Sequence, residues 1–143
     1  MVVADTSFLF SLFGRDAHTA AAQGWARQGK QPITVTGLNR YEFTNAIRFA
    51  EFRKVISHGD AFNSLAAFEA DLKHGILQLT PCDLAAAVSE AERLSELHTL
   101  ARGHRSFDIL HIATARVLKA TTILTFDLNQ RKLASAVGLS VSP

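Results

Sequence analysis

The side chains best suited to chemistry in this chain are four carboxylates, Asp5, Glu42, Asp108 and Asp127. Asp5 and Asp127 follow apolar, β-branched runs, whereas Glu42 and Asp108 lie in the early turns of helical patterns. If the strands are parallel, their ends and the helix starts share one sheet edge, and the four acids meet there. Carboxylates held close together raise one another's pKa, and a divalent cation removes that cost. Oxygen-only ligands favour Mg²⁺ or Mn²⁺, which indicates metal-assisted hydrolysis of a phosphodiester or phosphate ester.

The elements that must position these acids alternate along the chain. Short apolar runs bounded by turn residues predict strands, and apolar residues at helical spacing predict helices. We expect strands over residues 2–4, 32–36, 76–80, 122–126 and 139–141, and helices up to residue 13, over 18–28, from 37, over 57–73, over 81–100, from 106 and over 128–137. This alternation predicts a three-layer α/β/α fold with a central, mainly parallel, five-stranded sheet.

Several helix starts and faces can be assigned from residue types. Thr36, Ser57 and Ser106 have the side chains of helix N-caps. One face of the helix that follows Thr36 is predicted from the spacing of Phe43, Ala46, Ile47 and Ala50. The same argument for residues 81–100 places Glu90, Glu92 and Glu96 outward and the following residues inward: Leu84, Val88, Ala91, Leu94 and Leu97.

Composition sets the class of protein. The chain has 143 residues, 48% of them hydrophobic and 20% charged, which predicts one globular domain over residues 1–143. Its net charge is only +2, so a nucleic-acid partner must be argued from where the charges lie. The single cysteine, Cys82, excludes an internal disulfide and is consistent with a reducing compartment. The N-terminal sequence has neither a signal-peptide pattern nor an apolar run that could span a membrane, so we expect a cytoplasmic protein.

Basic residues lie close in sequence to three of the acids. Arg105, three residues before Asp108, is the best candidate for contact with a substrate phosphate. The competing interpretation is that these cations are solvated surface charges or helix-end charges. No array of aromatic residues indicates sequence-specific reading of RNA.

Four blocks of the sequence together resemble a known family. They are VVADTSFLF, YEFTNAI, RSFDILHIATA and ILTFDLNQRKLASAVGLSV, and they span nearly the whole chain in order. They resemble PIN-domain nucleases, in particular the VapC toxins of bacterial toxin–antitoxin pairs. The resemblance implies that Asp5, Glu42, Asp108 and Asp127 bind the metal. Supporting positions would be Thr6 and Thr125, which match hydroxyl positions, and Asn45 of the E-x-x-N-A motif, whereas Asn129 stands where many relatives carry a further acid.

The resemblance also implies an activity and partners. The protein would be a Mg²⁺- or Mn²⁺-dependent endoribonuclease, the toxin of a pair whose small antitoxin covers the active site. A homodimer is expected both from the resemblance and from the general frequency of twofold symmetric assemblies.

Simpler interpretations compete with this one. Asp5 or Asp127 alone would most often be a turn former or helix cap, and His111 is more often a hydrogen-bonded core histidine than a base or ligand. A catalytically silent PIN-like module that binds RNA or protein is the main alternative to an enzyme. A phosphotransfer receiver would need a second acid beside Asp5, where Thr6 stands, and a dinucleotide-binding fold would need a G-x-G-x-x-G motif.

Overall fold

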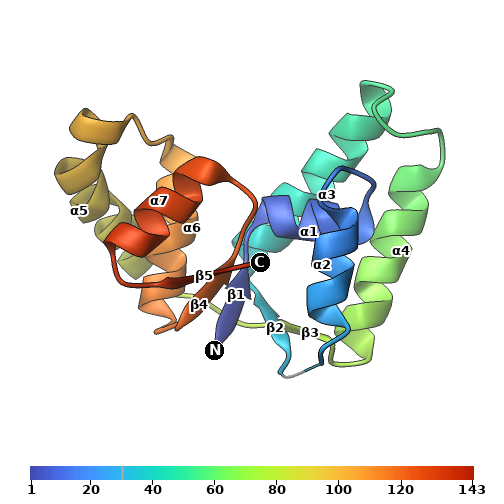
Figure 1. Ribbon diagram of the computed structural model, residues 1–143, viewed down its shortest axis with the longest axis horizontal. Coiled ribbons are helices and arrows are strands. Elements are labelled where there is room, and N and C mark those ends of the chain that lie inside the picture. The colour runs from blue at the N-terminus through green and yellow to red at the C-terminus, as the bar shows by residue number, and fades with distance from the viewer. Residues whose placement is uncertain (30) are drawn as a thin grey trace.

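A computed structural model describes residues 1–29 and 31–143 as a sheet between two layers of helices (Figure 1). The elements in chain order are β1 (Val2–Ala4), α1 (Thr6–Phe13), α2 (Thr19–Ala26), β2 (Ile33–Val35), α3 (Gly37–Phe52), α4 (Asp60–Lys73), β3 (Leu77–Leu79), α5 (Leu84–Arg102), α6 (Ser106–Val117), β4 (Thr122–Leu124), α7 (Leu128–Ala136) and β5 (Ser140–Ser142). The predicted three-layer α/β/α class is confirmed.

The sheet places its topological switch point beside the first acid. The strand order is β3-β2-β1-β4-β5, and every pairing between these strands is parallel. The chain therefore moves from β1 outward to β3 on one side, then returns to place β4 and β5 on the other. In open α/β sheets, ligands bind beyond the carboxyl ends of the strands where the order reverses. Here that position lies between β1, which Asp5 follows, and β4.

Two hydrophobic clusters hold the layers together. Val2 and Ala4 of β1 belong to a cluster shared with α1, α2, α3 and α4, whereas Val3 belongs to one shared with α5, α6 and α7. Alternation of side chains across the sheet produces this division. Figure 1 shows the four earlier helices on one side of the sheet and the three later helices on the other. No helix in the described part of the chain has the length and apolar character that a membrane span requires.

The observed helix starts agree only in part with the helix caps predicted from the sequence. Thr36 caps α3 as predicted, and Asn39 completes a capping box with it. Ser57 is not the cap of the next helix, whereas α6 begins at Ser106 as predicted, with Arg105 in the N-cap position. The left-handed residue Gly59 precedes α4, which begins at Asp60, and Ser57 donates its backbone N–H to that aspartate at 2.9 Å. Ser106 is already the first helical residue of α6.

The predicted inward face of α5 is correct only for Ala91 and Leu94. The helix begins after the cap residue Asp83 and not at residue 81, and Leu84, Val88 and Leu97 are exposed. Leu94 is buried and Ala91 packs against the same cluster, as predicted, and Ala87 is buried although the prediction did not include it. Residues 87, 91 and 94 have the same helical spacing as the predicted stripe, so periodicity could not decide between the two faces. Packing decides it, because Glu90 turns toward α6 and accepts from the Arg116 Nε at 2.6 Å.

Candidate active site

Three of the four acids lie at helix N-termini. Asp5 is the N-cap of α1 and accepts from the Phe8 N–H at 2.8 Å, and Asp127 is the N-cap of α7 and accepts from the backbone N–H groups of Asn129 at 2.8 Å and Gln130 at 2.9 Å. Asp108 is in the first turn of α6. The positive ends of the three helix dipoles favour anions at these positions. The capping interpretation of Asp5 and Asp127 therefore holds locally and is compatible with a shared site.

Asp5 is buried among hydroxyl groups. Its exposed fraction is 0%, and its two oxygens accept from Ser7 Oγ at 2.8 and 2.9 Å, while Oδ2 also accepts from Thr125 Oγ1 at 2.7 Å. Burial raises the pKa of Asp5 above its usual value, although the hydrogen bonds from Phe8, Thr125 and Ser7 oppose that rise. Thr125 thus lies beside this acid, as the resemblance implied.

Ser7 was not identified from the sequence as a site residue. Besides contacting Asp5, its Oγ accepts from the backbone N–H of Phe126 at 2.9 Å. It therefore joins the start of α1 to the segment that connects β4 with α7. A serine three residues after a strand has no distinguishing sequence signal, since turns and caps commonly contain one.

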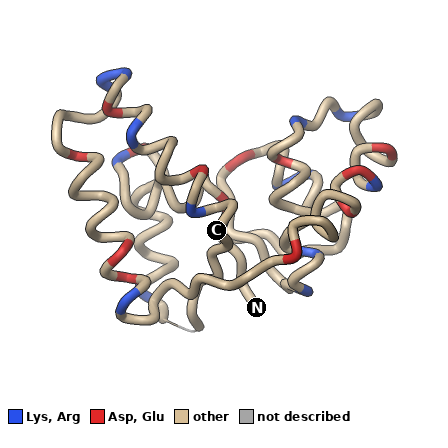
Figure 2. Tube along the Cα trace, turned by 180° about the vertical axis from the view of Figure 1, so that it is seen from behind, with Lys and Arg blue, Asp and Glu red and all other residues tan. Residues whose placement is uncertain are grey.

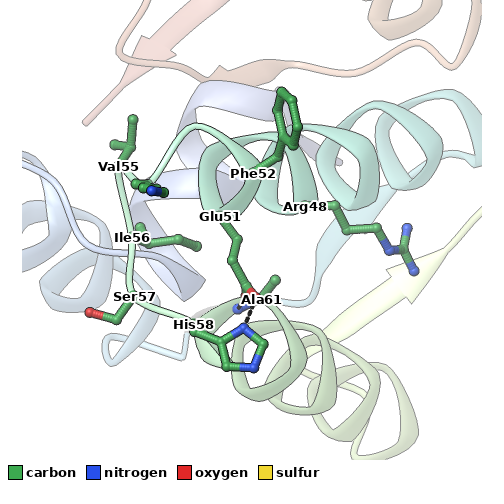
Figure 3. Close-up of a pocket in the computed structure, with 9 residues that line it drawn as sticks. Arg48, Glu51, Phe52, Val55, Ile56, Ser57, His58 and Ala61 are labelled. Atoms are coloured by element: carbon green, nitrogen blue, oxygen red, sulfur yellow. Dashed lines mark hydrogen bonds and ion pairs between the residues drawn. The ribbon is translucent and has the colours of Figure 1, made fainter.

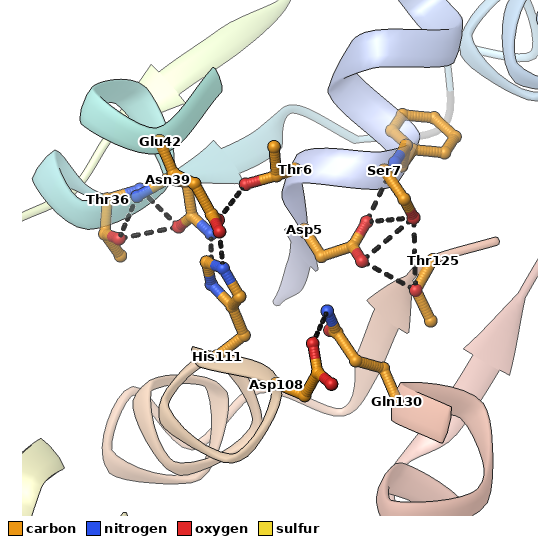
Figure 4. A network of polar contacts seen from close by, with 11 residues as sticks. Asp5, Thr6, Ser7, Thr36, Asn39, Glu42, Asp108, His111, Thr125 and Gln130 are labelled. Carbon is orange, nitrogen blue, oxygen red and sulfur yellow. Dashed lines mark hydrogen bonds and ion pairs between the residues drawn. The ribbon is translucent and has the colours of Figure 1, made fainter. Parts of the chain in front are cut away.

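Glu42 reaches the site from the second turn of α3. Its Oε2 accepts from Thr6 Oγ1 and contacts His111 Nε2 (Figure 4). Burial raises the pKa of Glu42, but the contact with His111 and the hydroxyl of Thr6 lower it by more, so its pKa lies below the usual value. Thr6 is therefore a partner of Glu42, and Glu42 is held in one orientation from both sides.

His111 is a buried core histidine, and its neighbours determine which ring nitrogen carries the proton. Asn39 Oδ1 accepts from Thr36 N at 3.0 Å and from Thr36 Oγ1 at 2.6 Å, so the amide nitrogen of Asn39 must face His111. That nitrogen lies 2.9 Å from Nδ1 of His111. Because an amide N–H donates, Nδ1 accepts, and the ring proton is on Nε2, where it is donated to Glu42. The expectation of a hydrogen-bonded core histidine agrees with this geometry, but the partner, Glu42, was missed.

Asp108 and Asp127 form the other half of the site. The Gln130 side-chain nitrogen lies 3.5 Å from Asp108 Oδ1, so α7 contacts α6 here. Burial raises the pKa of Asp108, and the negative charge of Asp127 raises it further. Figure 4 shows Asp5, Glu42 and Asp108 reaching the same region from separate elements. Packing therefore brings the four predicted acids to one sheet edge.

An open pocket of about 480 Å³ lies over this edge and is lined by Asp5, Glu42 and Asp127 among others. Its donors fit a hard divalent cation, since Mg²⁺ takes one or two carboxylates and completes its shell with water and phosphate oxygens. Across residues 1–29 and 31–143, no three His, Cys, Asp or Glu side chains come close enough to enclose an ion by themselves.

A larger hollow of about 850 Å³ lies elsewhere, between the end of α3 and the start of α4 (Figure 3). Its one carboxylate, Glu51, already accepts from the Ala61 N–H at 2.9 Å and contacts His58 at 3.1 Å. Glu51 is nine residues beyond Glu42 on the same helix, about 14 Å away. This hollow therefore lacks the donors that the acidic pocket has.

The remaining predicted site residues lie at the surface. Arg105 is exposed immediately before α6, where its charge opposes the rise in the Asp108 pKa. Asn45 is exposed one turn beyond Glu42, and Asn129 is exposed on α7. Figure 2 shows Lys and Arg positions distributed over both helical layers and not along one stripe.

The raised pKa values predict a response to metal. Without metal, Asp5 and Asp108 should titrate above the usual aspartate value of about 3.9, and bound Mg²⁺ should lower both pKa values. Carboxyl NMR titrations with and without Mg²⁺ measure this. Glu90 is the control, because Arg93 and Arg116 lower its pKa to about 2 on a distant part of the surface and Mg²⁺ should not change it. Identical curves for Asp5 and Asp108 in both conditions would contradict a shared metal site.

Comparison with known proteins agrees with this geometry. A family model described as "PIN domain" matches residues 2–136. No curated protein matches the chain by sequence. VapC20 of Mycobacterium tuberculosis, described as a sarcin-ricin loop cleaving toxin, has a similar structure with a TM-score of 0.70 and 16% identity over 100% of both chains.

Two further solved structures are also similar. VapBC2 from Rickettsia felis, bound to a DNA fragment from its promoter, has a TM-score of 0.68 and 14% identity over 99% of this chain and 98% of that one. FitAcB from Neisseria gonorrhoeae has a TM-score of 0.64 and 14% identity over 100% and 97%. At identities this low, the structural similarity to these three proteins shows a common fold and nothing more.

Proposed function

We propose that this chain, which belongs to the PIN domain family, is a divalent-metal-dependent endoribonuclease. The observation that carries the proposal is the meeting of four carboxylates at the topological switch point, two of them with raised pKa values. Such a cluster costs stability unless it binds a cation, and pKa values perturbed by burial and by like charge are typical of functional sites.

The residues of the site have two proposed roles, metal binding and orientation of the metal-binding carboxylates. Asp5, Glu42, Asp108 and Asp127 would hold Mg²⁺ or Mn²⁺, which activates water and stabilises the charge that develops in phosphodiester hydrolysis. Ser7 and Thr125 orient Asp5, and Thr6 and His111 orient Glu42. The N-termini of α1, α6 and α7 favour a phosphate group in the same place. Preorganisation of this kind lowers the barrier because the donors need not rearrange during the reaction.

The partners follow from the same proposal. Structural neighbours of the chain include a VapC toxin and VapBC and FitAB assemblies, two of them bound to DNA. We infer that this protein is the toxin of a cytoplasmic toxin–antitoxin pair, that it forms a homodimer, and that a small antitoxin blocks its active site. RNA is its substrate.

A catalytically silent PIN-like binding module is the second candidate. It is favoured by one observation, that in the described part of the chain no three potential ligands enclose an ion-sized space. Such a module would bind RNA or a protein without cleaving RNA, and its binding would not depend on a divalent cation.

Cleavage of labelled single-stranded RNA by the purified protein tests the proposal. We expect internal cleavage in Mg²⁺ or Mn²⁺ and none in EDTA, with activity restored when the metal is returned. Metal-independent RNA binding without cleavage in either metal would favour the silent module, and cleavage that persists in EDTA would contradict metal dependence.

Arg105 is proposed as a phosphate contact, and Arg105→Ala should test it separately from catalysis. Loss of one phosphate contact should weaken RNA binding and reduce the slope of log affinity against log salt by about 0.7, while metal affinity stays unchanged. RNA affinity across a salt series in Ca²⁺ measures the slope.

Arg27→Ala is the matched control for Arg105→Ala. Arg27 contacts Gln23 at the far end of α2, close in sequence to the start of β2 and therefore at the opposite sheet edge. An unchanged slope in Arg105→Ala would assign Arg105 to structure alone.

A further inference from the structure

Three aromatic rings form a parallel stack that leads from the core to the acidic pocket. Phe8, fully buried, stacks on Phe126 with ring centroids 6.1 Å apart and an interplanar angle of 13°. His18 stacks on Phe126 at 4.4 Å and 9°. The three rings come from α1, from the connection after β4 and from the turn before α2, so the sequence alone did not reveal them.

The position of His18 is fixed by the turn between α1 and α2. Gly14 ends α1 where a Cβ atom would lie 2.7 Å from the carbonyl oxygen of Phe10, so only glycine fits there without a shift of the backbone. Asp16 then holds the turn: its Oδ2 accepts from Ser11 Oγ at 2.7 Å and its Oδ1 from the His18 N–H at 2.8 Å. The imidazole therefore lies on Phe126 with its own backbone anchored.

His18 is the exposed end of the stack. Phe8 and His18 both stack on the Phe126 ring, and His18 is exposed and lines the same pocket as Asp5, Glu42 and Asp127. The exposed imidazole therefore borders the position where the proposed function places a phosphodiester.

We propose that His18 stacks an unpaired base of the RNA beside the phosphodiester that is cleaved. The proposal rests on the nuclease function proposed above and deepens it by assigning the residue that binds a base next to the reacting phosphodiester. A base can stack on the His18 ring only if it is not already stacked between its neighbours in a duplex. Bases of this kind occur in single-stranded RNA, where they can turn outward and stack on side chains.

The exposed imidazole of His18, called the stacking platform below, is expected to bind different bases. Stacking uses the π-face that every base has, whereas discrimination between bases requires free hydrogen-bonding groups at the base edge. Asp16, which accepts from the His18 backbone N–H, already accepts hydrogen bonds through both of its oxygens.

The test compares a base-bearing strand with one that has no bases. The probes are fluorescein-labelled hexauridylate and the same sugar–phosphate strand with every base removed. Fluorescence anisotropy measures the affinity of the protein for each probe in Ca²⁺. A gel verifies that the strands remain intact. His18→Ala should weaken hexauridylate binding about 5-fold or more and leave binding of the abasic strand unchanged. His18→Phe and His18→Tyr should bind hexauridylate as the wild type does, because they retain the flat ring.

A control variant and the outcomes below distinguish failure of the stacking proposal from failure of the nuclease proposal. His58→Ala, which removes an exposed histidine from the remote hollow, should bind both strands normally. If wild-type protein binds both strands equally, or if His18→Ala weakens both equally, the platform is wrong while the nuclease proposal stands. If neither strand binds, both proposals fail.

Discussion

Asp5→Asn is expected to abolish RNA cleavage and to weaken binding of divalent metal by more than about 100-fold, since loss of supporting groups around a metal already costs about 10- to 100-fold. Asparagine has nearly the same shape, so its side-chain oxygen can still cap α1 through the Phe8 N–H, and the hydroxyls of Ser7 and Thr125 can rotate to accept from the new amide. Calorimetric titration with Mn²⁺ and an RNA cleavage assay measure the two losses.

The same variant should be more stable than the wild type when no metal is present. Burial raises the pKa of Asp5 in the folded state, so its charged form costs stability. Below the unfolded pKa of about 3.9 that cost is absent, and it grows as the pH rises through the folded pKa. Asp5→Asn should therefore have a higher Tm than wild type at pH 7, with the difference vanishing at low pH.

Asp83→Asn provides the matched control for Asp5→Asn. Asp83 is also a helix N-cap, accepting from the Ala86 N–H at 3.0 Å, but it is exposed at the start of α5 and does not line the acidic pocket. It should retain full cleavage and metal affinity. Cleavage by Asp5→Asn at the wild-type rate would refute the proposed role of the acids.

His111→Leu is expected to lower metal affinity and cleavage by about 10- to 100-fold, although His111 is not itself proposed as a ligand. The substitution removes the Nε2–H that holds Glu42 and leaves only Thr6 to orient that carboxylate. Metal titration and cleavage rates measure the loss, and ¹⁵N NMR of the wild-type imidazole should show Nε2 donating to Glu42 and Nδ1 accepting from Asn39.

Two further variants distinguish positioning of Glu42 from simple loss of packing. His111→Gln places an amide N–H near the position of Nε2 and should recover most of the metal affinity. His111→Asn is the matched control, because its shorter side chain can reach Asn39 but not Glu42. Equal metal affinities in the Gln and Asn variants, or a ring protonated at Nδ1, would assign His111 to structure alone.

Local signals in the sequence determined the order of elements and the edge on which the acids meet. The run 2–4 before Asp5 and the cap Thr36 before α3 depend on neighbours a few residues away, so residue types were sufficient to predict them. Alternation of strands and helices implied parallel pairing, and parallel pairing alone brings Asp5 and Asp127 to the same edge.

Packing decided which face of each helix is buried. On α5 the predicted stripe included Leu84, Val88 and Leu97, which are exposed, whereas Ala87 and Leu94 are buried, and Glu90 contacts Arg116 on α6. At the start of α4, the left-handed conformation of Gly59 overrides the N-cap preference of Ser57. Local propensity is a weak energy that tertiary contacts routinely exceed.

Only the tertiary structure decided what surrounds each acid. The contacts of Asn39 with His111 and of Asp5 with Thr125 join residues 72 and 120 positions apart, and the stack of His18 on Phe126 joins two segments from opposite ends of the chain. Side chains such as Ser7 and His111 carry no sequence signal that names their partners. The sequence by itself thus determined which residues could bind a metal, whereas their orientation and pKa values depend on distances and burial that exist only once the chain has folded.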